Sequence, residues 1–125
     1  MLYMEENIIY ITKADDGVLE MNSLVDAQGT PYELSEGDQL TLTVRSAPTD
    51  ESPVVFATTS VPGSNRLVIR SADTADAEPG RYSADVQLTT ADGYRFTVWP
   101  MLEGSKRYRT SNLKNFVIMP EVTTT

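Results

Sequence analysis

The tightest constraint on the fold comes from residues 80–98, where apolar and polar residues alternate in two runs on either side of Asp92-Gly93. Alternation with a period of two places every second side chain on the same face of a β-strand. An Asp-Gly pair favours the tight turn of a hairpin, because both residues tolerate a positive φ. The sequence therefore predicts an antiparallel hairpin whose outer face carries Arg95, Thr97 and Trp99. Its core face is predicted to carry Tyr82, Ala84, Val86, Leu88, Phe96 and Val98.

Short runs of the same kind recur along the chain, separated by turns rich in glycine, proline, asparagine and aspartate. The runs cover residues 7–12, 18–25, 40–45, 53–58, 67–70 and 115–119. They add Leu40, Leu42, Val44, Leu67 and Ile69 to the predicted core. This pattern predicts an all-β fold, an antiparallel sandwich of about seven to eight strands. Residues 71–78 are predicted to form a loop or one helical turn.

A single domain is predicted for residues 1–125, because a chain of this length with 40% hydrophobic residues can bury one core. Within it, residues 1–6 and 120–125 are predicted to be flexible tails.

The segment Glu78-Pro79-Gly80-Arg81-Tyr82 resembles the tyrosine corner of immunoglobulin-like sandwiches. In that corner the tyrosine hydroxyl bonds to backbone a few residues upstream and fixes a loop that crosses between the sheets. We therefore predict that Gly80 and Tyr82 form a structural corner, in which the Tyr82 hydroxyl bonds to backbone within residues 73–79. The alternative is an ordinary core tyrosine at the start of a strand. The corner makes an antiparallel immunoglobulin-like β-sandwich the predicted fold class.

The residue types that most catalytic sites need are missing. The chain has no cysteine and no histidine, which excludes disulfides, thiolate nucleophiles and a Ser-His-Asp triad, and leaves no zinc ligands of the usual kind. No phosphate-binding glycine loop occurs. A Ser-Lys dyad would have to use Lys13, Lys106 or Lys114, each in or beside a predicted turn. We predict no enzyme, no cofactor and no small-molecule substrate.

Calcium is the one metal ion that the composition allows, because it prefers hard oxygen ligands. Asp15 with Asp16, or Asp73 with Asp76 and Glu78, could supply them. Neither cluster has the spaced ligands of a calcium loop, so solvated turn residues are the favoured interpretation and no metal site is predicted.

The net charge of −8, from 10 basic and 18 acidic residues, argues against nucleic acid or an anionic membrane as a partner. No apolar run approaches the ~18 residues of a membrane-spanning helix. The acidic start of the chain lacks the basic residues of a secretory signal peptide, so synthesis in the bacterial cytoplasm is expected.

Residues 101–114 differ in charge from the rest of the chain. They contain four basic residues and one acidic residue, a net +3, whereas the remainder has 6 basic and 17 acidic residues, a net −11. Arginine, tyrosine, tryptophan and methionine are the types enriched at protein interfaces. The residues predicted to bind a partner, either another copy or a neighbouring protein, are Trp99, Met101, Lys106, Arg107, Tyr108 and Arg109. The alternative is a surface loop with incidental charges.

Several motifs, read in order, resemble the N-terminal β-sandwich domain of phage baseplate upper proteins and related tail proteins. The resemblance spans about residues 8–123 and rests on turns and strand faces. The motifs are Gly37-Asp38 before a strand, Pro79-Gly80-Arg81-Tyr82 before Asp85-Val86-Gln87-Leu88, the Asp92-Gly93 turn, and Phe116-Val117-Ile118 before Glu121-Val122-Thr123. This chain departs from the family in the stretch from Trp99 to Lys114, where the family closes quickly, and in stopping at Thr125, where the family continues.

The resemblance implies a non-catalytic structural or adaptor module of a phage or prophage tail or baseplate, located in the virion. Its implied partners are other tail proteins or further copies of itself. The alternative function is an immunoglobulin-like binding module for a carbohydrate or a cell-surface protein. In that case Tyr94, Trp99 and Tyr108 would supply the aromatic contacts.

Overall fold

The computed structural model describes residues 1–22, 24–26, 28–47, 51–100 and 114–122. Strands dominate these residues, and the one helix among them is a single turn. The elements in chain order are β1 (Leu2–Glu5), β2 (Ile8–Thr12), β3 (Gly17–Glu20), β4 (Gln39–Arg45), β5 (Val54–Thr59), β6 (Arg66–Ile69), α1 (Ser71–Thr74), β7 (Gly80–Thr89), β8 (Arg95–Trp99) and β9 (Phe116–Met119). The prediction of an all-β fold is confirmed, and so is the helical turn after β6.

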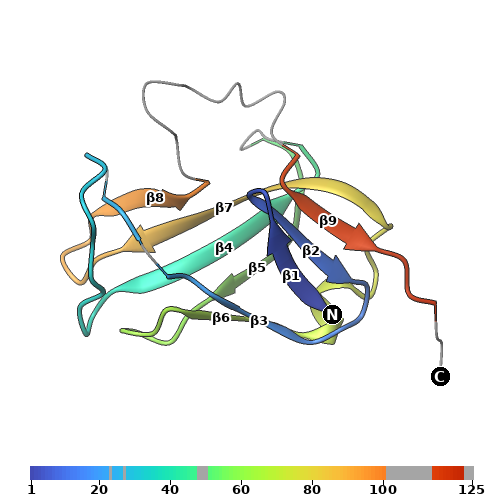
Figure 1. Ribbon diagram of the computed structural model, residues 1–125, viewed down its shortest axis with the longest axis horizontal. Coiled ribbons are helices and arrows are strands. Elements are labelled where there is room, and N and C mark those ends of the chain that lie inside the picture. The colour runs from blue at the N-terminus through green and yellow to red at the C-terminus, as the bar shows by residue number, and fades with distance from the viewer. Residues whose placement is uncertain (23, 27, 48–50, 101–113, 123–125) are drawn as a thin grey trace.

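The strands of the described residues form two sheets (Figure 1). The larger has seven strands in the order β1-β2-β9-β7-β4-β5, with β8 paired to β7, and the smaller pairs β3 with β6. All pairings are antiparallel except that of β2 with β9, which is parallel. The prediction of a purely antiparallel fold is therefore wrong at this pair. A period of two is the same in parallel and antiparallel strands, so the sequence pattern could not distinguish them.

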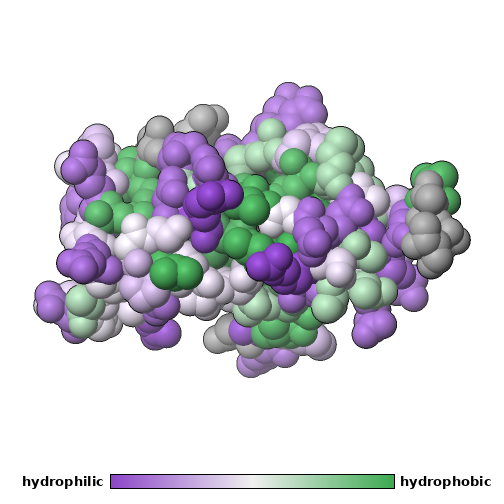
Figure 2. Space-filling model, turned by 90° about the horizontal axis from the view of Figure 1, so that it is seen from below, coloured by the Kyte–Doolittle hydropathy of each residue, from purple (hydrophilic) through white to green (hydrophobic). Residues whose placement is uncertain are grey.

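One apolar core is shared by both sheets, with Leu19, Leu67 and Ile69 of the small sheet packed in the same cluster as the large sheet. Nine of the eleven predicted core residues are buried, and the other two, Tyr82 and Phe96, are half-buried against the same core. Seen from below, the surface mixes polar and apolar residues in small patches, with an apolar stretch near the centre (Figure 2). No helix among the described residues is long and apolar enough to cross a membrane.

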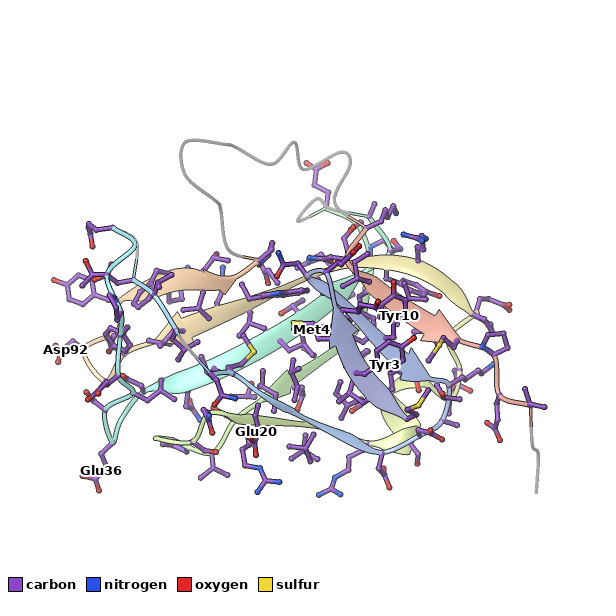
Figure 3. The ribbon with its side chains drawn as sticks, in the orientation of Figure 1. Tyr3, Met4, Tyr10, Glu20, Glu36 and Asp92 are labelled. Atoms are coloured by element: carbon purple, nitrogen blue, oxygen red, sulfur yellow. The ribbon has the colours of Figure 1, made fainter. Side chains whose placement is uncertain are left out.

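Residues 1–6 contain a strand, and the prediction of a flexible tail there is wrong. β1 pairs with β2 across a two-residue turn, in which Glu6 and Asn7 have φ of 51° and 63°. Positive φ at both positions is the type I′ geometry that matches the twist of a hairpin. The rings of Tyr3 and Tyr10 stack across the pair with their centroids 4.8 Å apart (Figure 3). Glu-Asn is a weaker turn signal than Asp-Gly, which is why the sequence did not reveal this hairpin.

The second predicted strand, residues 18–25, ends earlier than expected, because β3 stops at Glu20. Beyond it, Val25 forms only an isolated bridge with Pro31. Met21 and Leu24 are nevertheless buried and belong to the core cluster. Met21 and Leu24 are apolar because this irregular segment buries them in the core. The sequence pattern alone cannot distinguish such a segment from a hydrogen-bonded strand.

Candidate partner-binding region

β8 and β9 occupy the same position in the large sheet, one after the other along β7. Both run antiparallel to β7, with Trp99 opposite Val86 and Phe116 opposite Tyr82. Val86 and Tyr82 are four residues apart on β7, a distance of about 13 Å at ~3.3 Å per residue. The chain between Trp99 and Phe116, by contrast, comprises residues 100–115. The closing strand of the sheet is therefore interrupted, and the intervening residues leave and re-enter it at nearby points.

Asn115 replaces part of the ladder that the interruption removes. Its side-chain Nδ2 donates to the Ala84 carbonyl at 2.9 Å, and its Oδ1 accepts from the Ala84 N–H at 2.8 Å. The Asn115 carbonyl accepts from the N–H of Ile9 at 2.9 Å on the other side. Asn115 is 5% exposed, so the Ala84 peptide groups would otherwise face the interruption without a partner. The side-chain amide thus acts as a substitute strand residue and fixes where the chain re-enters the sheet.

Trp99 does not lie on the outer face where alternation predicts it. Gln87 pairs with Thr97 and Val86 with Trp99, so Val98 and Trp99 together oppose one residue of β7. This is the arrangement of a β-bulge, which shifts the alternation by one residue. Both side chains join the core, and Trp99 is only 3% exposed. Within the described residues its indole Nε1 has no hydrogen-bond partner.

The burial of Trp99 makes it a core residue, without the exposed ring that a surface anchor needs. The other predicted partner-binding residues, Met101, Lys106, Arg107, Tyr108 and Arg109, lie outside the residues that the structure describes. Lys114 is described, and its Nζ donates to the Ser46 carbonyl at 3.0 Å. Tyr94, an aromatic residue of the alternative carbohydrate-binding hypothesis, is 73% exposed beside the hairpin turn.

The predicted corner has the expected hydrogen bond. The Tyr82 hydroxyl donates to the Glu78 carbonyl, within the range of residues 73–79. Gly80 begins β7 with a φ of 155°, which L-residues rarely adopt. Tyr82, predicted on the core face, is half-buried and packs against the core. The hydrogen bond joins the loop between α1 and β7 to the large sheet.

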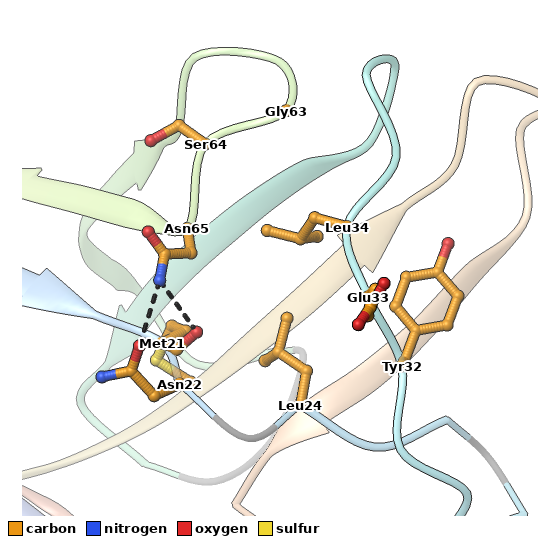
Figure 4. Close-up of a pocket in the computed structure, with 9 residues that line it drawn as sticks. All are labelled: Met21, Asn22, Leu24, Tyr32, Glu33, Leu34, Gly63, Ser64 and Asn65. Carbon is orange, nitrogen blue, oxygen red and sulfur yellow. Dashed lines mark hydrogen bonds between the residues drawn. The ribbon is translucent and has the colours of Figure 1, made fainter.

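A shallow hollow of about 380 Å³ lies between the irregular stretch after β3 and the loop before β6 (Figure 4). It is lined by Met21, Asn22, Leu24, Tyr32, Glu33, Leu34, Gly63, Ser64 and Asn65. The Asn65 Nδ2 donates to the Met21 carbonyl and to the Asn22 Oδ1, both at 3.3 Å. These bonds connect two walls of the hollow. The sequence analysis did not identify this site, because its residues come from segments that show no motif.

Asp38 fixes a third wall of the hollow. It is 2% exposed, and its carboxylate accepts from the Tyr32 hydroxyl at 2.7 Å and from the Ser35 N–H at 2.8 Å. The hydrogen bond to Asp38 raises the pKa of Tyr32 above its ordinary value of 10.0, with smaller contributions from desolvation and from the Asp38 charge. Tyr32 also packs edge-on against Phe96, with ring centroids 5.6 Å apart. Of the motifs noted in the sequence analysis, Gly37-Asp38 is the one that lies at this wall.

In the part of the chain that the structure describes, the carboxyl group of Asp85 has a pKa above its ordinary value of 3.8. Desolvation is the main cause, and the positive charge of Arg45 opposes it. Asp85 faces the polar side of the large sheet opposite Thr43. No group of three residues suited to bind a metal ion occurs in the described part of the chain.

Comparison with protein-family models, with curated proteins and with solved structures found no match to this chain. The resemblance to phage baseplate proteins thus depends on the turn and strand motifs of the sequence alone.

Proposed function

We propose that this chain is a non-catalytic structural or adaptor module that acts through protein–protein contacts in the tail or baseplate of a phage or prophage. The sequence motifs favour that setting. The interrupted closing strand supports a role in contacts, because it holds the two ends of the basic segment, residues 101–114, on a hydrogen-bonded frame. Segments positioned by a rigid scaffold commonly carry binding function.

The proposal includes an immunoglobulin-like sandwich. In that fold, strands B and E pair in one sheet while C, F and G pair in the other. β3 and β6 correspond in this scheme to B and E, β4 and β7 to C and F, and β8 with β9 to an interrupted G. Tyr82 then lies at the E–F corner, and Ala84 stands where antibody domains have a cysteine. This correspondence supports an immunoglobulin-like connectivity without the disulfide.

The observation that carries the proposed contact role is the pairing of β8 and β9 with the same edge of β7. An ordinary hairpin would need no such excursion, since most connections between elements are about 2 to 6 residues long. The excursion here also has a charge opposite to that of the rest of the chain. These properties match a contact element better than a spacer.

The test is to co-express the chain with the products of its neighbouring genes and to analyse the complexes by size-exclusion chromatography with light scattering. A variant in which residues 101–113 are replaced by a short Gly-Ser connection should fold and fail to join the complex. Purified tail particles should contain the wild-type chain when analysed by mass spectrometry. Absence of the chain from particles, or equal complex formation by the variant, would contradict the proposal.

A further inference from the structure

The hollow lies beside a strongly acidic stretch of the chain. Residues 20–38 carry five acidic side chains and no basic one. Glu33 lines the hollow, while Glu20 and Glu36 lie toward the lower side of the view in Figure 3. This wall of the molecule therefore presents a negative potential around a concave site.

Some of this charge is already compensated locally. Asp38 is bonded to Tyr32 and Ser35, Asp26 accepts two backbone N–H groups, and Glu20 lies 3.7 Å from Arg66. Within the described residues, Glu33 and Glu36 have no ion-pair partner. Both carboxylates are therefore available to a cation from outside.

The walls of the hollow favour a particular kind of cation. Met21, Leu24 and Leu34 supply apolar surface, and the amides of Asn22 and Asn65 supply polar groups beside it. Lysine and arginine side chains combine an aliphatic stem, which covers apolar surface, with a charged end that stays near water and acids. An extended peptide with several such side chains matches both the apolar surface and the acidic rim. This chain contains one, Ser-Lys-Arg-Tyr-Arg at residues 105–109.

We propose that the hollow is the docking site for residues 105–109 of a second copy of this chain. The basic side chains of the incoming segment face Glu33 and Glu36, and their aliphatic stems or the Tyr108 ring cover Leu24 and Leu34. Since each copy has one hollow and one basic segment, two copies can make the same contact twice in a closed pair. Opposite charges on the two surfaces also accelerate their encounter. The inference depends on the proposed function only in taking this segment as a contact element.

The first experiment exchanges charges across the contact. Sedimentation velocity at low salt should give a dimer for the wild-type chain and a monomer for Glu33→Arg/Glu36→Arg and for Arg107→Glu/Arg109→Glu. An equimolar mixture of the two variants should recover a dimer, because each hollow of one then matches the segment of the other. Glu5→Arg/Glu121→Arg, which changes the net charge equally at exposed sites away from the hollow's lining, should remain dimeric. Loss of association in this control, or no recovery in the mixture, would overturn the assignment.

The second experiment uses the segment as a separate probe. A synthetic peptide of residues 104–110 is titrated into the ¹⁵N-labelled variant Arg107→Glu/Arg109→Glu, whose own segment no longer competes. The expected result is a set of amide shift changes at Leu24, Leu34 and Asn65 that saturates with peptide and is reduced by salt. The same peptide with glutamate at positions 107 and 109 should produce none. Shifts confined to other residues, or no shifts, would overturn the inference.

Three further outcomes decide between this inference, the proposed function and an intramolecular contact. A strictly monomeric wild-type chain that still joins neighbouring gene products removes the second copy as occupant and leaves the adaptor role intact. A wild-type monomer in which charge reversal at 107 and 109 lowers only the unfolding midpoint identifies the chain's own segment as the occupant, which also overturns the inference. Dimer formation without any tail partner supports the docking site and contradicts only the tail role.

Discussion

At the residue scale, Asn115 gives the sharpest prediction. Asn115→Ala should lower the free energy of unfolding by about 2–4 kcal/mol, because it leaves both peptide groups of Ala84 buried without partners. Asn115→Asp keeps the acceptor for the Ala84 N–H and places a second oxygen against the Ala84 carbonyl, so it should not restore stability. Urea denaturation followed by circular dichroism measures both. A loss below about 0.5 kcal/mol for the alanine variant would mean that water replaces the amide.

Tyr82→Phe tests the corner directly. Removing the hydroxyl that donates to the Glu78 carbonyl should lower the free energy of unfolding by roughly 0.5–1.5 kcal/mol. Tyr94→Phe is a matched control, because Tyr94 is 73% exposed. An unchanged denaturation midpoint for Tyr82→Phe would show that water serves the hydroxyl and the carbonyl equally well.

Asp85 makes stability depend on pH. Its pKa is higher in the folded chain than its ordinary value of 3.8, so its contribution to folding is most favourable below that value. The contribution is lost as pH rises through the raised pKa, since the carboxylate is then charged in a partly desolvated site. Asp85→Asn should therefore be more stable than wild type at pH 7, and the difference should shrink toward pH 3. Denaturant midpoints measured across this range check the sign, and a less stable variant at pH 7 would indicate that the attraction of Arg45 dominates.

At the element scale, the interrupted strand predicts tolerance to changes between its two parts. Replacing residues 101–113 with a short Gly-Ser connection should leave the far-UV circular dichroism and the unfolding midpoint nearly unchanged. The reason is that β8, β9 and Asn115 keep all their hydrogen bonds to β7. Loop length by itself costs little, about 0.6 kcal/mol per doubling. A cooperative loss of structure in this variant would show that the removed residues belong to the core.

The elements differ in how well the sequence predicted them. The hairpin of β7 and β8 was predicted because strict alternation and Asp-Gly agree. The bulge at Val98 and Trp99 was not, since a one-residue shift depends on packing in three dimensions and leaves no local signal. β1 was missed for a similar reason, because its pairing with β2 brings Tyr3 against Tyr10 across a turn of unremarkable composition.

At the scale of the whole molecule, the pattern of short alternating runs and turns predicted an all-β fold but not the candidate site. Alternation and turns indicate which strand residues are buried, so half of the described buried apolar residues, nine of eighteen, were predicted from the local pattern. The hollow depends on where the loop before β6 meets the irregular stretch after β3, and Asn22 and Asn65 on these two walls are 43 residues apart in the chain. Charge distribution was the one long-range property of the site that could be read from the sequence.

Salt should have opposite effects on folding and on association. Replacing Arg107 and Arg109 with glutamate changes the net charge from −8 to −12, because each substitution subtracts 2. This charge repels itself in the compact state, so raising the ionic strength should raise the unfolding temperature of the monomeric Arg107→Glu/Arg109→Glu variant. The wild-type dimer should dissociate over the same range, because screening weakens attraction between exposed opposite charges. Differential scanning calorimetry and sedimentation velocity in matched buffers test the two effects. An unfolding temperature that falls with salt in the variant would indicate that favourable ion pairs dominate its surface.

The position of β9 also sets an order of events during synthesis. β9 lies between β2 and β7, and it is the last strand in the described part of the chain to leave the ribosome. Until it arrives, β2 and the first residues of β7 each have an unpaired edge, and Ile9 and Ile11 lack their neighbours Phe116 and Ile118. The large sheet therefore cannot be completed before residues 116–119 have been synthesised. Until β9 is in place, the unpaired edges of β2 and β7 can pair with strands of other chains. The nascent chain is therefore most prone to aggregation during that interval.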